Sequence, residues 1–357
     1  MSFFYTKGVA IESIAAAVPS KIIDAETLTK KFNKEYIDKF IKSTGISSCH
    51  QALDNQTASD LGFAAAEHLL NTKGINRNQI GILIFVSTSP DYRKPATSCV
   101  LQKRLGLSQD CACIDLVHGC AGFIYGHQTM QAMMQTSEFN YGLLITAETS
   151  SKVIDQNNSN CMMFGDAGAA TLYVRDENTT NLTVLKADGN RYKNLIIPSG
   201  GFRDMHPEKE YFLTENGEKY SKFLMYMDGM EIFNFSCNDV LITINEYLDR
   251  LGKKADDFDL FACHQANNFI IQRLTKKLGL PKEKVPVCLD RYGNTSSASI
   301  PLVLCDFFGK KQGVKQTILA SGFGLGLAWG VTSFDIMVDN ILPVIETDVT
   351  FDEGIFK

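Results

Sequence analysis

The sequence predicts an α/β protein made of two related halves, each holding a sheet that is buried on both faces. Short apolar runs with the composition of buried strands alternate with segments of helical periodicity in both halves. Each half closes with a glycine-rich turn that leads into a strand, at 164–174 and 321–338. Strands that are apolar throughout are typical of sheets covered by helices on both sides. We therefore predict an N-terminal half at 1–180 and a C-terminal half at 181–357.

The elements of the two halves follow from local patterns. Pro19 ends the first strand, Asp54 to Thr57 supply caps for the helix after them, and Gly279 with Pro281 ends a later helix. The polar stretch 175–225 is predicted as surface loop and hairpin, either a flap over a cleft or a solvated insertion. In the first half, strands are expected at 8–18, 80–87, 111–117, 141–147 and 164–174, and helices at 24–44, 58–70, 96–105 and from Cys120 to 136. In the second half, helices are expected at 230–248, 267–278 and 297–309, and strands at 260–264, 285–289, 316–320 and 331–338.

Composition narrows the classes of function. A net charge of −5 and a pI near 5.7 argue against a nucleic-acid binder, which carries a basic excess. No apolar run approaches the roughly 20 residues that cross a bilayer, and the N-terminus lacks a signal-peptide pattern, so we expect a cytoplasmic protein without membrane association. The ten cysteines are scattered and form no C-x-x-C pair, which predicts reduced thiols and no metal site.

The stretch D-L-V-H-G-C-A-G-F-I-Y-G at 115–126 places Cys120 where a strand ends and a helix begins. Unpaired N–H groups and the helix dipole favour negative charge at that point, so we expect a lowered thiol pKa. Gly119 and Gly122 allow a sharp turn and a close approach of substrate. Cys120 is therefore a candidate nucleophile, and the alternative is a small core residue.

Three further motifs carry residues that suit a nucleophilic cysteine. His264 ends a buried strand and opens H-Q-A-N, where it is either a partner of the cysteine or a core histidine. Asn294 lies in Y-G-N-T-S-S and is either a site residue or an ordinary turn residue. The run G-F-G-L-G from Gly322 to Gly326 lacks the lysine and spacing of a phosphate loop, so a backbone N–H that stabilises an oxyanion is the better interpretation.

The four motifs occur in an order that resembles the β-ketoacyl-acyl carrier protein synthase III family of thiolase-fold ketosynthases. They read G-C-A-G-F, H-Q-A-N, Y-G-N-T-S-S-A-S-I-P and G-F-G-L-G-L-A-W-G. S-T-S-P-D-Y, F-G-D-A-G-A-A and M-D-G-M-E-I-F extend the resemblance over nearly the whole chain. The resemblance implies a thiolase-like, duplicated, five-layered α-β-α-β-α sandwich, a homodimer, and a place in fatty acid biosynthesis.

The resemblance also implies a reaction. Cys120, His264 and Asn294 match the family's Cys-His-Asn triad, and the N–H groups of Cys120 and Gly324 match its oxyanion hole. The implied activity is decarboxylative Claisen condensation of an acyl thioester with a malonyl-type thioester on acyl carrier protein, through an acyl-cysteine. Coenzyme A or carrier-protein thioesters are the expected substrates, and no further cofactor is expected. Substrate contacts are implied at Phe164, Gly229, Asn267, Phe269, Lys94 and Ser43.

Three of those positions depart from the family pattern. Ser43 replaces an arginine before T-G-I, and Phe269 stands where an arginine usually follows H-Q-A-N. Lys94 replaces a large apolar residue that lines the acyl pocket of the partner subunit. Lost arginines remove bidentate contacts to phosphate. We hypothesise that both substrates arrive on carrier proteins, or that the acyl group is unusual, as in a secondary-metabolite or surface-polymer pathway.

Two other functions stay open. One is acyl transfer to an oxygen or nitrogen nucleophile without loss of carbon dioxide, and the other is a non-catalytic partner subunit of another ketosynthase. Asn294 favours carbon–carbon bond formation, because an amide donates without titrating, whereas an acidic residue would suit attack by an alcohol. The intact Cys-His-Asn set argues against a scaffold subunit.

Overall fold

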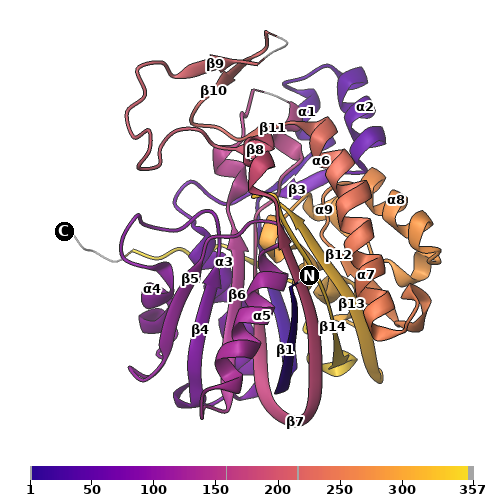
Figure 1. The fold of residues 1–357 in the computed structure, drawn as a ribbon. Coiled ribbons are helices and arrows are strands. Elements are labelled where there is room, and N and C mark those ends of the chain that lie inside the picture. Colours follow the sequence, from indigo (N-terminus) through magenta and orange to yellow (C-terminus); the bar gives the residue numbers. More distant parts are fainter. Residues whose placement is uncertain (1, 158, 215–216, 353–357) are drawn as a thin grey trace.

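The computed structural model describes residues 2–157, 159–214 and 217–352, and its centre is a sheet that nine strands form among these residues (Figure 1). The strand order is β5-β4-β6-β7-β14-β13-β12, with β1 along β7 and β15 beside β1. The strands are β1 (Phe3–Pro19), β4 (Ile80–Val86), β5 (Ala112–Leu116), β6 (Tyr141–Glu148), β7 (Ala167–Ala187), β12 (Leu260–Cys263), β13 (Lys315–Gly324), β14 (Ala328–Met337) and β15 (Ile345–Thr347). Short two-stranded pairs are β2 (Ile22–Asp24) with β3 (Ser48–His50), β8 (Leu195–Ile196) with β11 (Tyr226–Met227), and β9 (Tyr211–Leu213) with β10 (Lys219–Ser221).

The long strand β7 joins the two halves. Its first part pairs with β6 and its last part with β14, while β1 runs antiparallel along both parts. The predicted boundary at residue 180 therefore falls inside β7, next to the irregularity where β1 shifts register between Lys7 and Val9. Parallel strands β4, β5 and β6 form one wing of the sheet, and parallel strands β12 and β13 lie in the other.

Helices cover the sheet in three layers. They are α1 (Ala25–Thr29), α2 (Lys34–Thr44), α3 (Ala58–Lys73), α4 (Thr97–Arg104), α5 (Gly122–Gln135), α6 (Gly229–Phe235), α7 (Leu241–Leu251), α8 (Asn268–Leu278), α9 (Leu289–Tyr292) and α10 (Ser299–Phe308), with a π-helical turn at Ser236–Val240. Single 3₁₀ segments lie at Arg77–Gln79, Ser150–Val153, Ser159–Met162, Gly189–Asn194, Ala255–Asp257, Lys282–Lys284, Ser296–Ala298 and Val338–Asn340.

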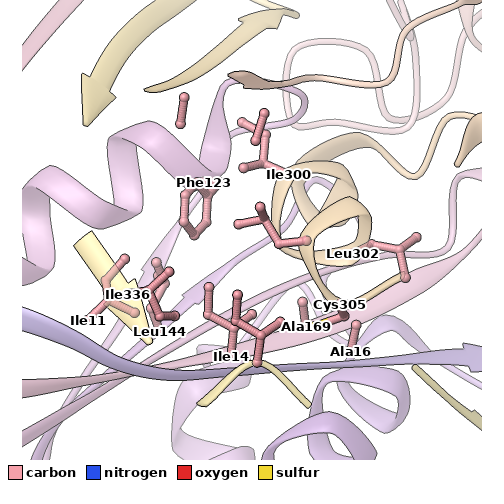
Figure 2. Close-up of a cluster of buried hydrophobic side chains, with 14 of the residues drawn as sticks. Ile11, Ile14, Ala16, Phe123, Leu144, Ala169, Ile300, Leu302, Cys305 and Ile336 are labelled. Atoms are coloured by element: carbon pink, nitrogen blue, oxygen red, sulfur yellow. The ribbon is translucent and has the colours of Figure 1, made fainter. Parts of the chain in front are cut away.

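The middle layer consists of α5 and α10, which lie between the two wings of the sheet. Figure 2 shows Phe123 of α5 and Ile300 of α10 packed among side chains of β1, β6, β7 and β14. A second apolar cluster joins α3 and α4 to the outer face of the first wing, and a third joins α7 and α8 to the second wing. The layers therefore run helix, sheet, helix, sheet, helix, which confirms the predicted five-layered thiolase-like sandwich.

Strand β4 shows why the buried strands are apolar throughout. Ile84 faces the middle helix layer, while the next residue, Phe85, faces the outer layer with α3. Because successive side chains of a strand point to opposite faces, a strand between two helix layers has no polar face. The prediction of sheets buried on both faces is confirmed.

Three predicted elements are wrong. The single helix at 24–44 is two helices, because Asn33 caps a new helix by accepting from the N–H of Glu35. Residues 175–187 continue β7 instead of forming a loop, since the strand passes from one half to the other. The strand predicted at 285–289 is absent: the run leads into α9.

The buried run before α9 obtains its hydrogen bonds from a side chain in place of a strand partner. The carboxamide of Gln265 accepts from the N–H of Cys288 at 3.2 Å and donates to the carbonyl of Pro286 at 3.4 Å. Proline also lacks the N–H that a central strand needs. The rest of the polar stretch matches its prediction, because β9 and β10 form a hairpin.

Candidate active site

Cys120 lies in the short connection between β5 and α5, at the N-terminus of that helix (Figure 1). The N–H of Gly122 donates to the carbonyl of Gly119 at 2.6 Å, which forms the predicted sharp turn. The Cys120 residue is only 7% exposed. Burial raises the pKa of its thiol to about 11. The lowered pKa expected for the Cys120 thiol is therefore wrong, because desolvation raises the pKa more than the Ser296 hydroxyl and the nearby backbone lower it.

Ser296 connects Cys120 to the two other residues of the predicted triad. Its hydroxyl Oγ lies 3.7 Å from the Cys120 Sγ. Its N–H donates to the Asn294 Oδ1 at 2.9 Å, and its backbone carbonyl lies close enough to the His264 imidazole to raise the pKa of that ring. All three triad residues therefore meet around one serine, although they lie up to 174 positions apart in the sequence.

His264 follows the last residue of β12 and is almost fully buried. Its Nδ1 lies 2.8 Å from the Ser299 Oγ, and its ring makes an edge-to-face contact with Phe323. Burial lowers the pKa of His264 to about 3. The imidazole is therefore neutral at physiological pH.

Asn294 is held by backbone pairing with the strand-like segment around Phe164. Its N–H donates to the carbonyl of Met163 at 2.9 Å, and its own carbonyl accepts from the N–H of Gly165 at 3.1 Å. Since its Oδ1 accepts from Ser296, its carboxamide NH₂ is turned away from that bond. The Asn294 carboxamide NH₂ is therefore not used in the bond to Ser296.

The glycine run after β13 passes directly against the Cys120 side chain. A Cβ on Gly324 would lie 2.7 Å from the Cys120 Cβ and 3.0 Å from its Sγ, so only glycine fits there. The backbone of Leu325 also lies near this sulfur and lowers the pKa of the Cys120 thiol. The predicted oxyanion donors, the N–H groups of Cys120 and Gly324, belong to these two adjoining segments.

Glu148 is a site residue that the sequence interpretation missed. It ends β6 and is fully buried, and its carboxylate accepts from the Thr88 N–H at 3.1 Å, the Thr88 hydroxyl at 2.9 Å and the Ser89 hydroxyl at 2.9 Å. Burial raises the pKa of Glu148 to about 7, and its negative charge raises the pKa of Cys120. The sequence did contain an indication of this role. Functional sites lie at the carboxyl ends of parallel strands, and Glu148 directly follows the apolar run at 141–147.

A cavity of about 730 Å³ adjoins this centre at Phe164, whose neighbour Met163 pairs with Asn294. The β9–β10 hairpin forms one wall of it, so the polar stretch does cover a cavity, as one of its two predicted alternatives proposed. Its remaining lining mixes methionine with polar side chains: Ile154, Asp155, Asn157, Tyr211, Glu218, Lys219, Tyr220, Ser221, Leu224, Met225 and Met227.

Three of the other predicted substrate contacts lie near the N-terminus of α8. Ser43 is in the last turn of α2, which packs against α8, and its hydroxyl donates to the carbonyl of Phe40. Phe269 is 59% exposed and stacks on Phe233 of α6. Asn267 caps α8 by accepting from the Ile270 N–H at 2.9 Å.

Gly229 and Lys94 occupy exposed positions on other segments. Gly229 is the first residue of α6 and has open space around its Cα. Lys94 is exposed on the loop before α4, and the neighbouring Arg93 donates to the carbonyl of Gly200. The structure therefore brings Phe164 to the triad, gathers Ser43, Asn267 and Phe269 at α8, and places Lys94 on a separate loop.

Neither a metal-binding cluster nor a membrane-spanning helix occurs among the described residues. Within residues 2–157, 159–214 and 217–352, no group of three or more His, Cys, Asp or Glu side chains could hold a metal ion. No helix in the described part of the chain is long and apolar enough to cross a membrane.

A five-layered fold with a cysteine, a histidine and an asparagine around one buried centre defines the class of thiolase-fold acyltransferases. The family models for 3-oxoacyl-[acyl-carrier-protein] synthase III match residues 114–189, and those for its C-terminal part match residues 248–336. The chain belongs to this β-ketoacyl-[acyl-carrier-protein] synthase III family.

Individual relatives cover nearly the whole chain. The β-ketoacyl-[acyl-carrier-protein] synthase III of Streptococcus suis is 32% identical over 326 residues, which are 90% of this chain and 96% of that protein. The enzyme of the same name from Natranaerobius thermophilus is 35% identical over 88% of this chain and 95% of its own. A crystal structure of 3-oxoacyl-(acyl-carrier protein) synthase from Burkholderia xenovorans superposes with a TM-score of 0.89 at 35% identity, covering 97% of this chain and 99% of that one.

Proposed function

We propose that the protein is a ketosynthase that joins an acyl group to a malonyl-type unit by decarboxylative Claisen condensation. The family membership supports this activity, and its curated relatives carry the name β-ketoacyl-[acyl-carrier-protein] synthase III. The observation that carries the proposal is the meeting of Cys120, His264 and Asn294 around Ser296 in a buried centre.

In the first half-reaction, Cys120 attacks the carbonyl carbon of an acyl thioester. A new carbon–sulfur bond forms to Cys120, the old thioester bond breaks, and the thiol proton ends on the departing thiol. The N–H groups of Cys120 and Gly324 are the proposed donors to the oxyanion of the tetrahedral intermediate. Close contact of Gly324 with the sulfur supports this placement.

In the second half-reaction, His264 and Asn294 are the proposed donors to the thioester oxygen of the malonyl group. The bond to the carboxylate breaks, carbon dioxide leaves, and the electron pair becomes an enolate held by the two donors. The enolate carbon then attacks the acyl-cysteine, and the Cys120 thiolate is released. A His264 pKa of about 3 supports this role, because a neutral imidazole donates one N–H without protonating the enolate.

The cavity under the β9–β10 hairpin is the proposed path for the thioester arm. Phe164 lines it and lies beside the backbone that holds Asn294. Its methionine side chains suit a flexible acyl or pantetheine chain, because methionine adapts its shape at little cost. Acyl carrier protein is the proposed partner, a homodimer the proposed assembly and the cytoplasm the proposed location.

The donor is proposed to arrive on a carrier protein, or to carry an unusual acyl group. The surface that Ser43, Asn267 and Phe269 form at the N-terminus of α8 is the proposed mouth of the site. Ser43 and Phe269 supply no cationic group there to the phosphates of coenzyme A. Incubation with a panel of acyl-coenzyme A and acyl-carrier thioesters, followed by the intact mass of the protein, tests this. Efficient and exclusive acylation by acetyl-coenzyme A would contradict it.

The condensation itself is tested by mixing the acylated protein with a malonyl carrier thioester after dialysis against a chelator. Release of one carbon dioxide per β-ketoacyl product, without added cofactor, is expected. Formation of an ester or amide without carbon dioxide would establish the acyl-transfer alternative instead. Light scattering of the purified protein tests the homodimer.

A further inference from the structure

Ser296 contacts each member of the triad through a different group. Its hydroxyl faces the Cys120 sulfur, its N–H binds the carboxamide oxygen of Asn294, and its carbonyl lies close enough to the His264 imidazole to raise the pKa of that ring. Its side chain also lies beside Gly119, where an added Cβ would come within 3.3 Å of the serine oxygen. The residue is 5% exposed, so these contacts are shielded from water.

The backbone of Ser296 has a left-handed conformation, with φ of 51°. Among the described residues other than glycine it is the one with positive φ. Such a conformation is disfavoured for residues with a Cβ and occurs where surrounding contacts impose it. Here it directs the N–H of Ser296 to the Asn294 Oδ1 and its carbonyl towards His264.

We propose that Ser296 is the positioning residue of this active site, which holds Asn294 through the N–H of its left-handed backbone and the Cys120 sulfur through its hydroxyl, with its carbonyl beside His264. The inference rests on the proposed function for the roles of the triad. It adds that two parts of Ser296 have separate roles. The hydroxyl affects the rate at which Cys120 is acylated, and the backbone affects the rate of decarboxylation.

The hydroxyl is tested by the alkylation rate of Cys120 with iodoacetamide, followed by peptide mass spectrometry from pH 7 to 10. Ser296→Ala and Ser296→Gly both remove the hydroxyl that stabilises the thiolate. We expect both to slow alkylation by on the order of five-fold at every pH in this range, because a hydrogen bond to a thiolate is lost. This shift of the pH profile is a readout that a purely structural role would leave unchanged.

The backbone is tested by decarboxylation of a malonyl carrier thioester. Ser296→Gly keeps the left-handed conformation at no steric cost, so we expect decarboxylation within about two-fold of the parent protein. Ser296→Val disfavours that conformation, because a β-branched residue with positive φ is a steric outlier. We expect it to lose decarboxylation by at least ten-fold while thermal unfolding shows a folded protein.

Thr295→Val is the matched control. The Thr295 hydroxyl is buried in the same turn and has no hydrogen-bond partner among the described residues, and valine keeps its shape. We expect unchanged alkylation and unchanged decarboxylation.

Alkylation of Ser296→Ala at the parent rate, or full decarboxylation by a folded Ser296→Val, would overturn the inference. Alkylation needs no substrate, so it still tests the hydroxyl if the parent protein decarboxylates nothing. An absence of decarboxylation by the parent protein would contradict the proposed function and leave the inference about the hydroxyl standing.

Discussion

The reaction centre and the mouth near α8 differ in how firmly their side chains are fixed. At the centre, Cys120, His264 and Asn294 are buried and each has a contact to Ser296. At the mouth, Phe269 is 59% exposed, and the Ser43 hydroxyl donates to the carbonyl of Phe40 in its own helix. The centre is therefore a buried network in which each group contacts another, whereas the Ser43 and Phe269 side chains are exposed.

This difference indicates which positions can be substituted without loss of the chemical reaction. A change at the centre leaves a buried polar group without its partner, which costs far more than the loss of the bond itself. A change at the exposed Ser43 or Phe269 leaves no buried polar group without its partner. We therefore expect substitutions at the centre to affect the rate of chemistry, and substitutions at the mouth to affect the choice of donor.

The largest effect is expected for Cys120→Ala. Without the sulfur no acyl-enzyme forms, so condensation should fall by on the order of 10⁴-fold or more. The measurement is β-ketoacyl product formation together with the intact mass after incubation with acyl thioester. Cys99→Ser, at an exposed free cysteine on α4, is the control and should retain full activity. Undiminished condensation by Cys120→Ala would show that the centre does not act through this sulfur.

Asn294→Asp should have the next largest effect. The change keeps the shape but places an acceptor, and a negative charge when ionised, where the enolate develops, so decarboxylation of malonyl thioester should fall by about 10²-fold or more. Acylation of Cys120 should be less affected, which separates the two half-reactions. The matched control is Asn78→Asp in an exposed turn. Equal losses in both half-reactions would contradict separate roles for the triad residues.

Glu148→Gln should change the pH dependence of the thiol. The pKa of Glu148 is about 7, so the side chain is neutral below that pH and carries its charge above it. Its charge raises the pKa of Cys120. Removing the charge should therefore speed iodoacetamide alkylation above pH 8 by about three- to ten-fold and leave the rate near pH 6 unchanged.

The paired control for this substitution is Glu67→Gln, at a half-exposed carboxylate that pairs with Arg77 away from the site. It should leave the rate of alkylation unchanged both near pH 6 and above pH 8. Equal acceleration by Glu148→Gln at pH 6 and pH 9 would contradict a charge effect, because the carboxyl is neutral at the lower pH.

The sequence predicted most of the centre because its motifs are local. Cys120 and His264 each follow an apolar strand and Gly324 ends one, and these strands belong to the parallel pairs β4–β5 and β12–β13. The layered fold was predictable for a related reason, since strands without a polar face require helices on both sides.

What the sequence did not predict depends on contacts between distant segments. Ser296 looked like one more serine in a turn, and its role is visible only when three segments meet at it. The strand predicted at 285–289 does not form, because this segment hydrogen-bonds to the Gln265 side chain instead of to a strand. The periodicity of the sequence does not indicate such a side-chain contact. The raised pKa of Cys120 likewise depends on burial by the whole fold.

The smallest effect is expected for Phe269→Arg at the mouth. An arginine there restores a guanidinium where the family usually has one, and an exposed phosphate contact contributes on the order of 1 kcal/mol or less, so KM for acyl-coenzyme A should fall by about two- to five-fold. The kcat should stay constant, since the centre is untouched. The gain should shrink as salt rises, because an exposed charge pair is screened.

Phe269→Leu is the matched control, because it keeps an apolar side chain beside Phe233 without adding charge. It should not lower KM at any salt concentration. A change in kcat with Phe269→Arg would show that the mouth and the centre are coupled. That outcome would remove the distinction between a fixed centre and a variable mouth, since a side chain exposed to solvent would then reach the buried network around Ser296.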